Sequence, residues 1–147
     1  MLRVFLMGMS FAIAAFPAAA ENQTSYEGHY SNNNTAAILD ANLVRKAEDR
    51  YSISLSTNVP IKENQPGCAG SIEGEINITG KTTTLSVANE GFNTKAKETA
   101  QNKRYCEISI TFLNEYTMEL QEVGGCSYYH GASCSFSGVV EHDASGI

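Results

Sequence analysis

Apolar and polar residues alternate along most of this 147-residue chain. In one segment, Ile108, Ile110 and Phe112 occupy every second position, and the polar residues Ser109 and Thr111 lie between them. Because successive side chains of a β-strand point to opposite faces, this period of two predicts strands with one buried face. Eight segments show the pattern: 26–30, 37–43, 51–55, 72–78, 83–87, 106–112, 116–120 and 134–140.

Turn-forming residues separate several of these segments, at 32–34, 79–81, 114–115 and 124–125. Sequential strands that each have one apolar face predict an all-β fold, a small antiparallel barrel of about eight strands. A two-sheet β-sandwich fits the same alternation and is the alternative. Gly28, Gly74 and Gly138 fall on inward positions, where glycine permits the bending or close approach that barrel closure requires. The expected core residues include Ile76, Ile110, Leu120 and Phe136.

Two segments depart from the alternation. Residues 45–50 form a charged link that we interpret as a solvated turn, and residues 89–104 form a long polar stretch. The long stretch contains Lys95, Lys97, Lys103 and Arg104. A loop of this length is either functional or a mobile surface loop, and the sequence favours the second interpretation.

The first twenty residues have the features of a secretory signal peptide. Arg3 supplies the positive start, residues 4–16 form an apolar run, and Ala18-Ala19-Ala20 provides the small-residue cleavage pattern. The run is shorter than the roughly 20 residues that span a bilayer. We therefore expect a soluble, exported, periplasmic protein with no membrane anchor, whose single all-β domain comprises residues 21–147.

The charge balance narrows the choice of partners. Sixteen acidic and ten basic residues give a net charge of −6, which becomes −7 when Arg3 leaves with the signal peptide. Nucleic-acid binding requires a basic patch, so this balance argues against a nucleic-acid partner. A hydrophobic content of 42% suffices for a core and excludes a disordered or collagen-like chain.

All four cysteines follow the expected signal peptide: Cys68, Cys106, Cys126 and Cys134. An even number in an oxidising compartment predicts two disulfides. We favour the pairs Cys68–Cys106 and Cys126–Cys134, because the second would close a short local loop; the four cysteines allow two other pairings. No C-x-x-C is present and His130 stands alone between Cys126 and Cys134, so no metal site is expected.

The sequence offers little support for catalysis. It contains no G-x-S-x-G, H-E-x-x-H, P-loop or G-x-G-x-x-G motif. Of its three histidines, His29 falls on an outward strand position and His142 lies near the C-terminus. Glu73 and Glu75 share the outward face of one strand, where they act as a solubilising pair. We therefore expect neither an enzyme nor a cofactor.

One glycine-bounded segment is a candidate for partner binding: Ser127, Tyr128, Tyr129, His130 and Gly131. Tyrosine is a good recognition residue because it buries a large area while losing few torsions. A disulfide that fixes such a loop lowers the ordering cost of binding. The alternative is structural, with a tyrosine capping the core and His130 bonding to the turn.

The layout resembles the periplasmic and membrane-bound inhibitors of c-type lysozyme, which are small antiparallel barrels. The resemblance rests on these stretches: Tyr26-Glu27-Gly28-His29-Tyr30, Cys68-Ala69-Gly70, Cys106, and the segment from Cys126 to Cys134 followed by Ser135-Phe136-Ser137-Gly138. In that family a loop containing serine, glycine and tyrosine enters the lysozyme cleft. The resemblance implies this role for Ser127, Tyr128 and Gly131.

Charge is consistent with this expectation, because c-type lysozymes are basic and an acidic partner is steered toward them. Their cleft contains two carboxyl groups, which His130 or a backbone N–H of the loop could meet. The competing function is a carrier, since an eight-stranded barrel can hold one small hydrophobic ligand. The inward residues are mostly large and apolar, which favours a filled core. The sequence does not specify an oligomeric state.

Overall fold

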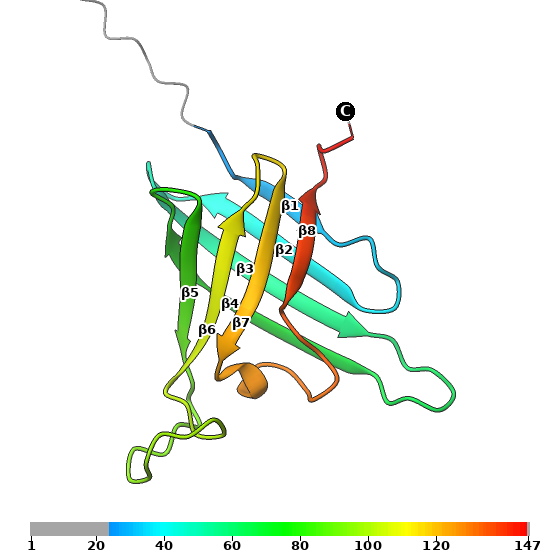
Figure 1. Ribbon diagram of the computed structural model, residues 1–147, viewed down its shortest axis with the longest axis vertical. Coiled ribbons are helices and arrows are strands. Elements are labelled where there is room, and N and C mark those ends of the chain that lie inside the picture. The colour runs from blue at the N-terminus through cyan, green and yellow to red at the C-terminus, as the bar shows by residue number, and fades with distance from the viewer. Residues whose placement is uncertain (1–23, 147) are drawn as a thin grey trace, which may run out of the picture.

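The computed structural model describes residues 24–146 (Figure 1). The expected signal peptide, residues 1–20, lies outside the described residues. Between residues 24 and 146, no helix has the length and apolar character needed to cross a membrane. The strands are β1 (Gly28–Ser31), β2 (Ile38–Arg45), β3 (Arg50–Val59), β4 (Cys68–Asn77), β5 (Thr82–Ala88), β6 (Tyr105–Phe112), β7 (Thr117–Gly124) and β8 (Gly138–His142), and a 3₁₀ turn, η1, spans Cys126–Tyr128.

The eight strands form one antiparallel sheet in the order β4-β3-β2-β1-β8-β7-β6-β5. Strands β1–β4 run obliquely across β5–β8, so the sheet curls back on itself (Figure 1). The ends of the sheet, β4 and β5, contact each other without forming a hydrogen-bonded ladder. The fold is therefore a nearly closed barrel, which confirms the predicted all-β class and the eight strands.

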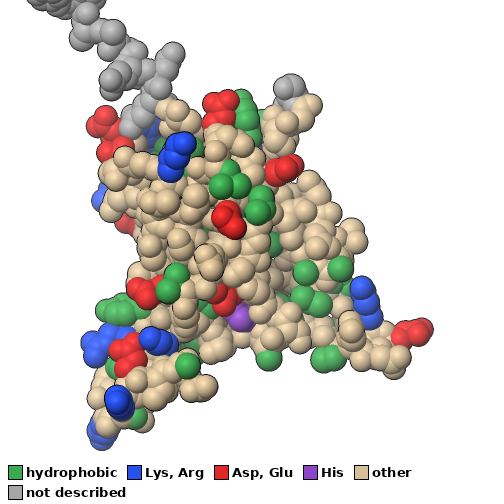
Figure 2. All heavy atoms as spheres, viewed as in Figure 1, with side chains coloured by type: hydrophobic (Ala, Val, Ile, Leu, Met, Phe, Trp, Pro, Cys, Tyr) green, Lys and Arg blue, Asp and Glu red, His purple; other side chains and the backbone are tan. Residues whose placement is uncertain are grey.

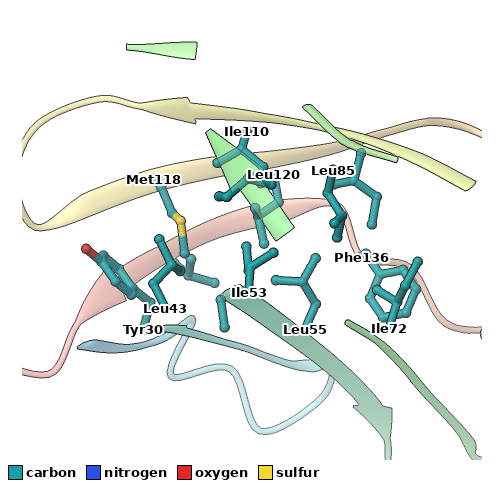
Figure 3. Packing of buried hydrophobic residues seen from close by; sticks show 14 of the residues in the cluster. Tyr30, Leu43, Ile53, Leu55, Ile72, Leu85, Ile110, Met118, Leu120 and Phe136 are labelled. Atoms are coloured by element: carbon teal, nitrogen blue, oxygen red, sulfur yellow. The ribbon is translucent and has the colours of Figure 1, made fainter. Parts of the chain in front are cut away.

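The core fills the space between the two halves of the barrel. Inward positions of β2 and β3, such as Leu43, Ile53 and Leu55, point toward those of β5–β7 (Figure 3). The predicted core residues are all buried: Ile76, Ile110, Leu120 and Phe136. The period of two thus identified the correct face of each strand.

Gly74 explains how β4 and β5 approach without pairing. A Cβ at this position would lie 2.7 Å from Leu85 Cδ1 and 3.2 Å from Val87 Cγ2. The side chains of β5 occupy the space that a larger residue on β4 would need. This close approach confirms the inward position that the alternation assigned to Gly74, and it seals the middle of the β4–β5 seam by packing.

The disulfide pairing predicted from the sequence is wrong. The bonds join Cys68 to Cys134 and Cys106 to Cys126. The β6–β7 hairpin is the reason for the second bond, because its register places Glu107 opposite Gly124, beside both cysteines. Cys126 and Cys134 therefore attach the segment between them to two different strands. Two disulfides indicate an oxidising, extracytoplasmic compartment.

Candidate functional site

The candidate segment begins immediately after β7. Gly125 has φ 78°, in the left-handed region, and a Cβ there would lie 2.0 Å from the Tyr105 carbonyl oxygen. Glycine is therefore required for the chain to leave β7 against β6. The η1 turn follows, and the Tyr129 N–H closes it by donating to Cys126 O at 2.8 Å.

Both ends of the segment are covalently attached to the barrel. Cys126 is bonded to Cys106 of β6, and Cys134 to Cys68 at the start of β4. We refer to residues 126–134 as the pinned loop. It is a loop held at two points on separate strands, rather than the single ring that the sequence predicted.

The pinned loop spans the seam between β4 and β5. The Ser71 N–H donates to Tyr129 O at 3.2 Å, and Gly70 forms an isolated antiparallel bridge with His130. On the other side, the Tyr129 hydroxyl donates to Ala88 O of β5. The loop thus joins the two ends of the sheet where the ladder between them is missing.

Tyr129 helps to join the two ends of the sheet. Its ring is half-buried and packs against the core, which is the structural role that the sequence left open as an alternative. Burial raises the pKa of its hydroxyl, with smaller contributions from Glu90 and Tyr128. The neutral hydroxyl is the form that donates to Ala88 O.

His130 is also turned inward. Its side chain is 8% exposed and its ring meets that of Phe136 edge to face. Nδ1 donates to Gly131 O at 2.8 Å, and Nε2 lies 3.0 Å from Glu122 Oε1, at ion-pair distance but without the angles of a hydrogen bond. The expectation that His130 meets a partner's carboxyl group does not fit this burial.

Glu122 is a residue that sequence reasoning missed. Its Oε1 accepts hydrogen bonds from Phe136 N and from Ser135 Oγ, in addition to the contact with His130. One carboxylate on β7 therefore organises the chain on both sides of Cys134. The signal in the sequence is a break in the alternation, because Glu122 continues the inward series of Met118 and Leu120 with a charged residue.

Tyr128 is the exposed member of the predicted group. Its ring is 53% exposed and contacts the ring of Tyr129 edge to face, at 5.3 Å between centroids. A Cβ at Gly91 would lie 2.9 Å from the Tyr128 ring, so this ring rests against the backbone of the β5–β6 connection. Ser127 and Gly131 are exposed as well.

The β5–β6 connection, residues 89–104, folds into a projection that we call the arm (Figure 1). Asn89 N donates to Arg104 O, and Asn89 Nδ2 donates to both Lys103 O and Gly125 O. Further out, Asn93 and Asn102 bond to each other. The long surface loop predicted from the sequence is thus folded on itself and anchored beside the pinned loop.

A hollow of about 210 Å³ separates the arm from the pinned loop. Its walls include Phe92 and Lys103 of the arm and Ser127 and Tyr128 of the pinned loop. Sequence reasoning missed Lys103 as a site residue because it lies far from Tyr128 along the chain. The Cys106–Cys126 bond brings the two segments together.

Other candidate chemistry is sparse in the described part of the chain. His29 is outward, as predicted, and its ring contacts Asp143 at 3.0 Å and Asp40 at 3.6 Å. His142 Nε2 donates to Glu27 O at 3.1 Å. Within residues 24–146, no group of three or more His, Cys, Asp or Glu residues is arranged to hold a metal ion.

Comparison with known proteins adds no relative to this description. No family model, curated protein or solved structure matches the chain. The resemblance noted from the sequence is supported as far as architecture, an eight-stranded antiparallel barrel with two disulfides.

Proposed function

We propose that this is an exported, periplasmic binding protein that inhibits a c-type lysozyme through Tyr128 and the residues around it. The observation that carries the proposal is the exposure of Tyr128 on a loop that two disulfides attach to the barrel. Ser127 lines the same hollow as Tyr128, and Gly131 is exposed farther along the loop. This is the surface that the sequence resemblance assigned to the cleft.

Rigid presentation favours tight binding. A loop that is ordered before binding loses little conformational freedom when it meets its partner. Tyr128 contributes an aromatic ring with a polar tip, and such residues dominate the energetic centres of interfaces. The contact with Gly91 supports the ring without covering its exposed half.

Lys103 supplies the charge that His130 does not. Its ammonium group is partly exposed and lies 4.0 Å from Glu98 Oε1, a loose surface contact. It belongs to the same hollow as Tyr128. A lysine beside the anchoring tyrosine complements the two carboxyl groups of a lysozyme cleft. Away from the arm the protein is mainly acidic, which steers a basic partner toward it.

The test is inhibition of c-type lysozyme by the purified protein and by Tyr128→Ala. We expect Tyr128→Ala to weaken inhibition by roughly thirtyfold or more, because truncating a central tyrosine commonly costs over 2 kcal/mol. Tyr116→Ala is the matched control: its ring is 43% exposed, and it lies just before β7, at the opposite end of the barrel.

Thermal melting distinguishes a role of Tyr128 in recognition from a role in stability. Both tyrosine variants should melt close to the unmutated protein, because each side chain is about half exposed and neither belongs to the core. Lys103→Glu should weaken inhibition by about tenfold if Lys103 meets a carboxylate. If the unmutated protein leaves lysozyme fully active at micromolar concentration, the proposal fails.

The carrier alternative has no specific observation in its favour. The side chains of Figure 3 occupy the space inside the barrel, where a hydrophobic ligand would lie. The largest hollow that we describe, discussed below, lies on the outside of the sheet and contains several charged and hydroxyl side chains.

A further inference from the structure

A groove of about 470 Å³ crosses the outer face of the sheet. Its floor is formed by short side chains, Ser54 and Ser56 of β3 and Ser71 of β4. Longer side chains rise on both sides: Asp40 and Asn42 of β2 on one, and Glu73 of β4 with Tyr129 on the other. The outward serines of the central strand therefore create the depression.

The groove is acidic. Asp40 and Glu73 stand on opposite sides of it, and Glu75 follows on the same outward face of β4. In the described chain, neither Glu73 nor Glu75 forms an ion pair, and Asp40 has only His29 at 3.6 Å. A surface of this kind favours a cationic occupant that donates hydrogen bonds, because the serine hydroxyls can accept them.

The arm has the opposite character. It contains four basic and two acidic residues in a protein whose net charge is −6. Hydrogen bonds tie residue 89 to 104 and residue 93 to 102, which leaves residues 94–101 as the tip. Lys95 and Lys97 lie on the tip, and among residues 24–146 neither has an ion-pair partner.

The arm projects away from the barrel, and basic side chains gather on it at the lower left of Figure 2 (compare Figure 1). The tip is exposed along its length, so its lysines are available to another molecule. Apart from Glu98 and Gln101, the other residues of the tip are small, namely Thr94, Ala96, Thr99 and Ala100. A narrow, lysine-bearing tip of this shape suits a groove whose floor is built of serines.

We propose that the protein associates with itself head to tail, with the arm tip of one copy in the acidic groove of the next. The contact joins two different surfaces of the same chain, so the copy that donates its arm keeps a free groove and the copy that receives it keeps a free arm. Lys95 and Lys97 meet Glu73, Glu75 or Asp40, and their ammonium groups donate to the serine hydroxyls.

The association is independent of the proposed lysozyme inhibition. It uses the tip of the arm, whereas inhibition uses Tyr128 and Lys103 near its base. Variants at the tip can therefore remove one property and leave the other.

Sedimentation velocity tests the proposal. The unmutated protein should form dimers and larger species at about 20 mM salt, and the association constant should fall at least tenfold at about 300 mM, where the Debye length is much shorter. Lys95→Glu with Lys97→Glu should sediment as a monomer at low salt. Glu73→Lys with Glu75→Lys should do the same. All four positions are exposed, so melting temperatures should be preserved.

Mixing the two charge-reversed variants provides the decisive test. The acidic arm of one variant then faces the basic groove of the other, and the basic arm of the second faces the acidic groove of the first. The mixture should therefore associate although neither component does alone. Lys81→Glu with Glu119→Lys, which changes exposed charges away from both surfaces, should associate like the unmutated protein.

Three results would overturn the proposal. The first is an unmutated protein that stays monomeric at low salt and about 100 μM, a concentration at which even weak contacts would show. The second is association that survives both charge reversals, which would place the contact elsewhere. The third is a monomer whose groove binds an oligoarginine peptide, which would make the occupant a different basic chain.

Discussion

At the scale of single residues, Tyr30 shows how burial controls a titrating group. Its side chain is fully buried between the halves of the barrel, and its hydroxyl donates to Tyr26 O at 3.0 Å. Burial, with smaller contributions from Tyr26 and Tyr51, raises the pKa of Tyr30 to about 12. The folded protein therefore holds the phenol in its neutral form well above the pH at which an exposed tyrosine ionises.

Stability should consequently fall in alkaline solution. Below pH 10 the phenol is neutral in both the folded and unfolded chains. Between pH 10 and about 12 the unfolded chain loses this proton and the folded chain keeps it, so the free energy of unfolding decreases, by about 2–3 kcal/mol in all. Urea unfolding from pH 9 to pH 12 measures the decrease.

Tyr30→Phe is the control for this effect, because it removes the titrating group and keeps the ring. Other tyrosines and lysines titrate in the same range, and they contribute equally to both proteins. The unmutated protein should therefore lose more stability than the variant as the pH rises. Parallel losses would contradict the assignment of the effect to Tyr30.

Phe136 tests the packing of the core. It lies just before β8, outside the regular strand, and is completely buried. Phe136→Ala should lower the free energy of unfolding by about 3–5 kcal/mol, because it removes a buried ring and leaves a cavity. Val139→Ala, at a side chain that is 47% exposed, should change stability by about 0.5 kcal/mol or less. Equal melting temperatures for the two variants would show that the face of this segment is misassigned.

At the scale of elements, the pinned loop replaces a missing ladder. β4 and β5 share no hydrogen-bonded register, and the loop connects them through Ser71 and Ala88. A loop usually tolerates change better than the strands that it joins. Here the loop completes the barrel, so its integrity and the stability of the fold are linked.

Removing the Cys106–Cys126 bond should affect both the stability of the barrel and the position of Tyr128. In the chain-entropy model, a bond that spans 20 residues contributes about 3 kcal/mol. We expect replacement of both cysteines by Ala to lower stability by about that amount and also to weaken the proposed lysozyme inhibition, because Tyr128 follows Cys126 closely. Urea unfolding and inhibition assays measure the two effects.

Peptide mapping without reduction checks the pairing itself. Fragments should remain linked between Cys68 and Cys134 and between Cys106 and Cys126. A linked fragment that contains Cys126 and Cys134 alone would contradict the structure. The double variant Cys68→Ala with Cys134→Ala offers a comparison, since its longer loop of 66 residues should cost about 4 kcal/mol.

At the scale of the whole molecule, the sequence reveals features that depend on local patterns better than features that depend on which segments are neighbours in space. Alternation depends only on adjacent residues, which is why the eight strands could be predicted, although the last begins at Gly138 and not at Cys134, and Tyr116, expected to face inward, is exposed. Disulfide pairing depends on which strands are neighbours, and chain proximity favoured Cys126–Cys134 incorrectly. The register of the β6–β7 hairpin brings Cys106 opposite residues 124–125, one or two residues from Cys126 and much farther along the chain from Cys134.

The same difference between local pattern and spatial neighbourhood applies to the candidate site. The glycine-bounded tyrosines were recognisable because they are consecutive, but their directions were not: Tyr128 points outward, whereas Tyr129 and His130 point inward. Lys103 could not be found, since a disulfide brings it to the site, and Glu122 was marked only by its inward position on the strand and not by its partners. Charge totals likewise concealed the separation between the acidic groove and the basic arm.

The connectivity of the two disulfides has a consequence for how the protein is made. The Cys106–Cys126 bond is nested inside the segment closed by Cys68 and Cys134. A chain exported N-terminus first presents Cys68 and Cys106 to an oxidase before either native partner emerges. We therefore expect the first pair available for oxidation to be absent from the folded protein, and the native bonds to be reached by thiol–disulfide exchange. On this expectation, the yield of folded protein from a secreting cell depends on a disulfide isomerase as well as on an oxidase.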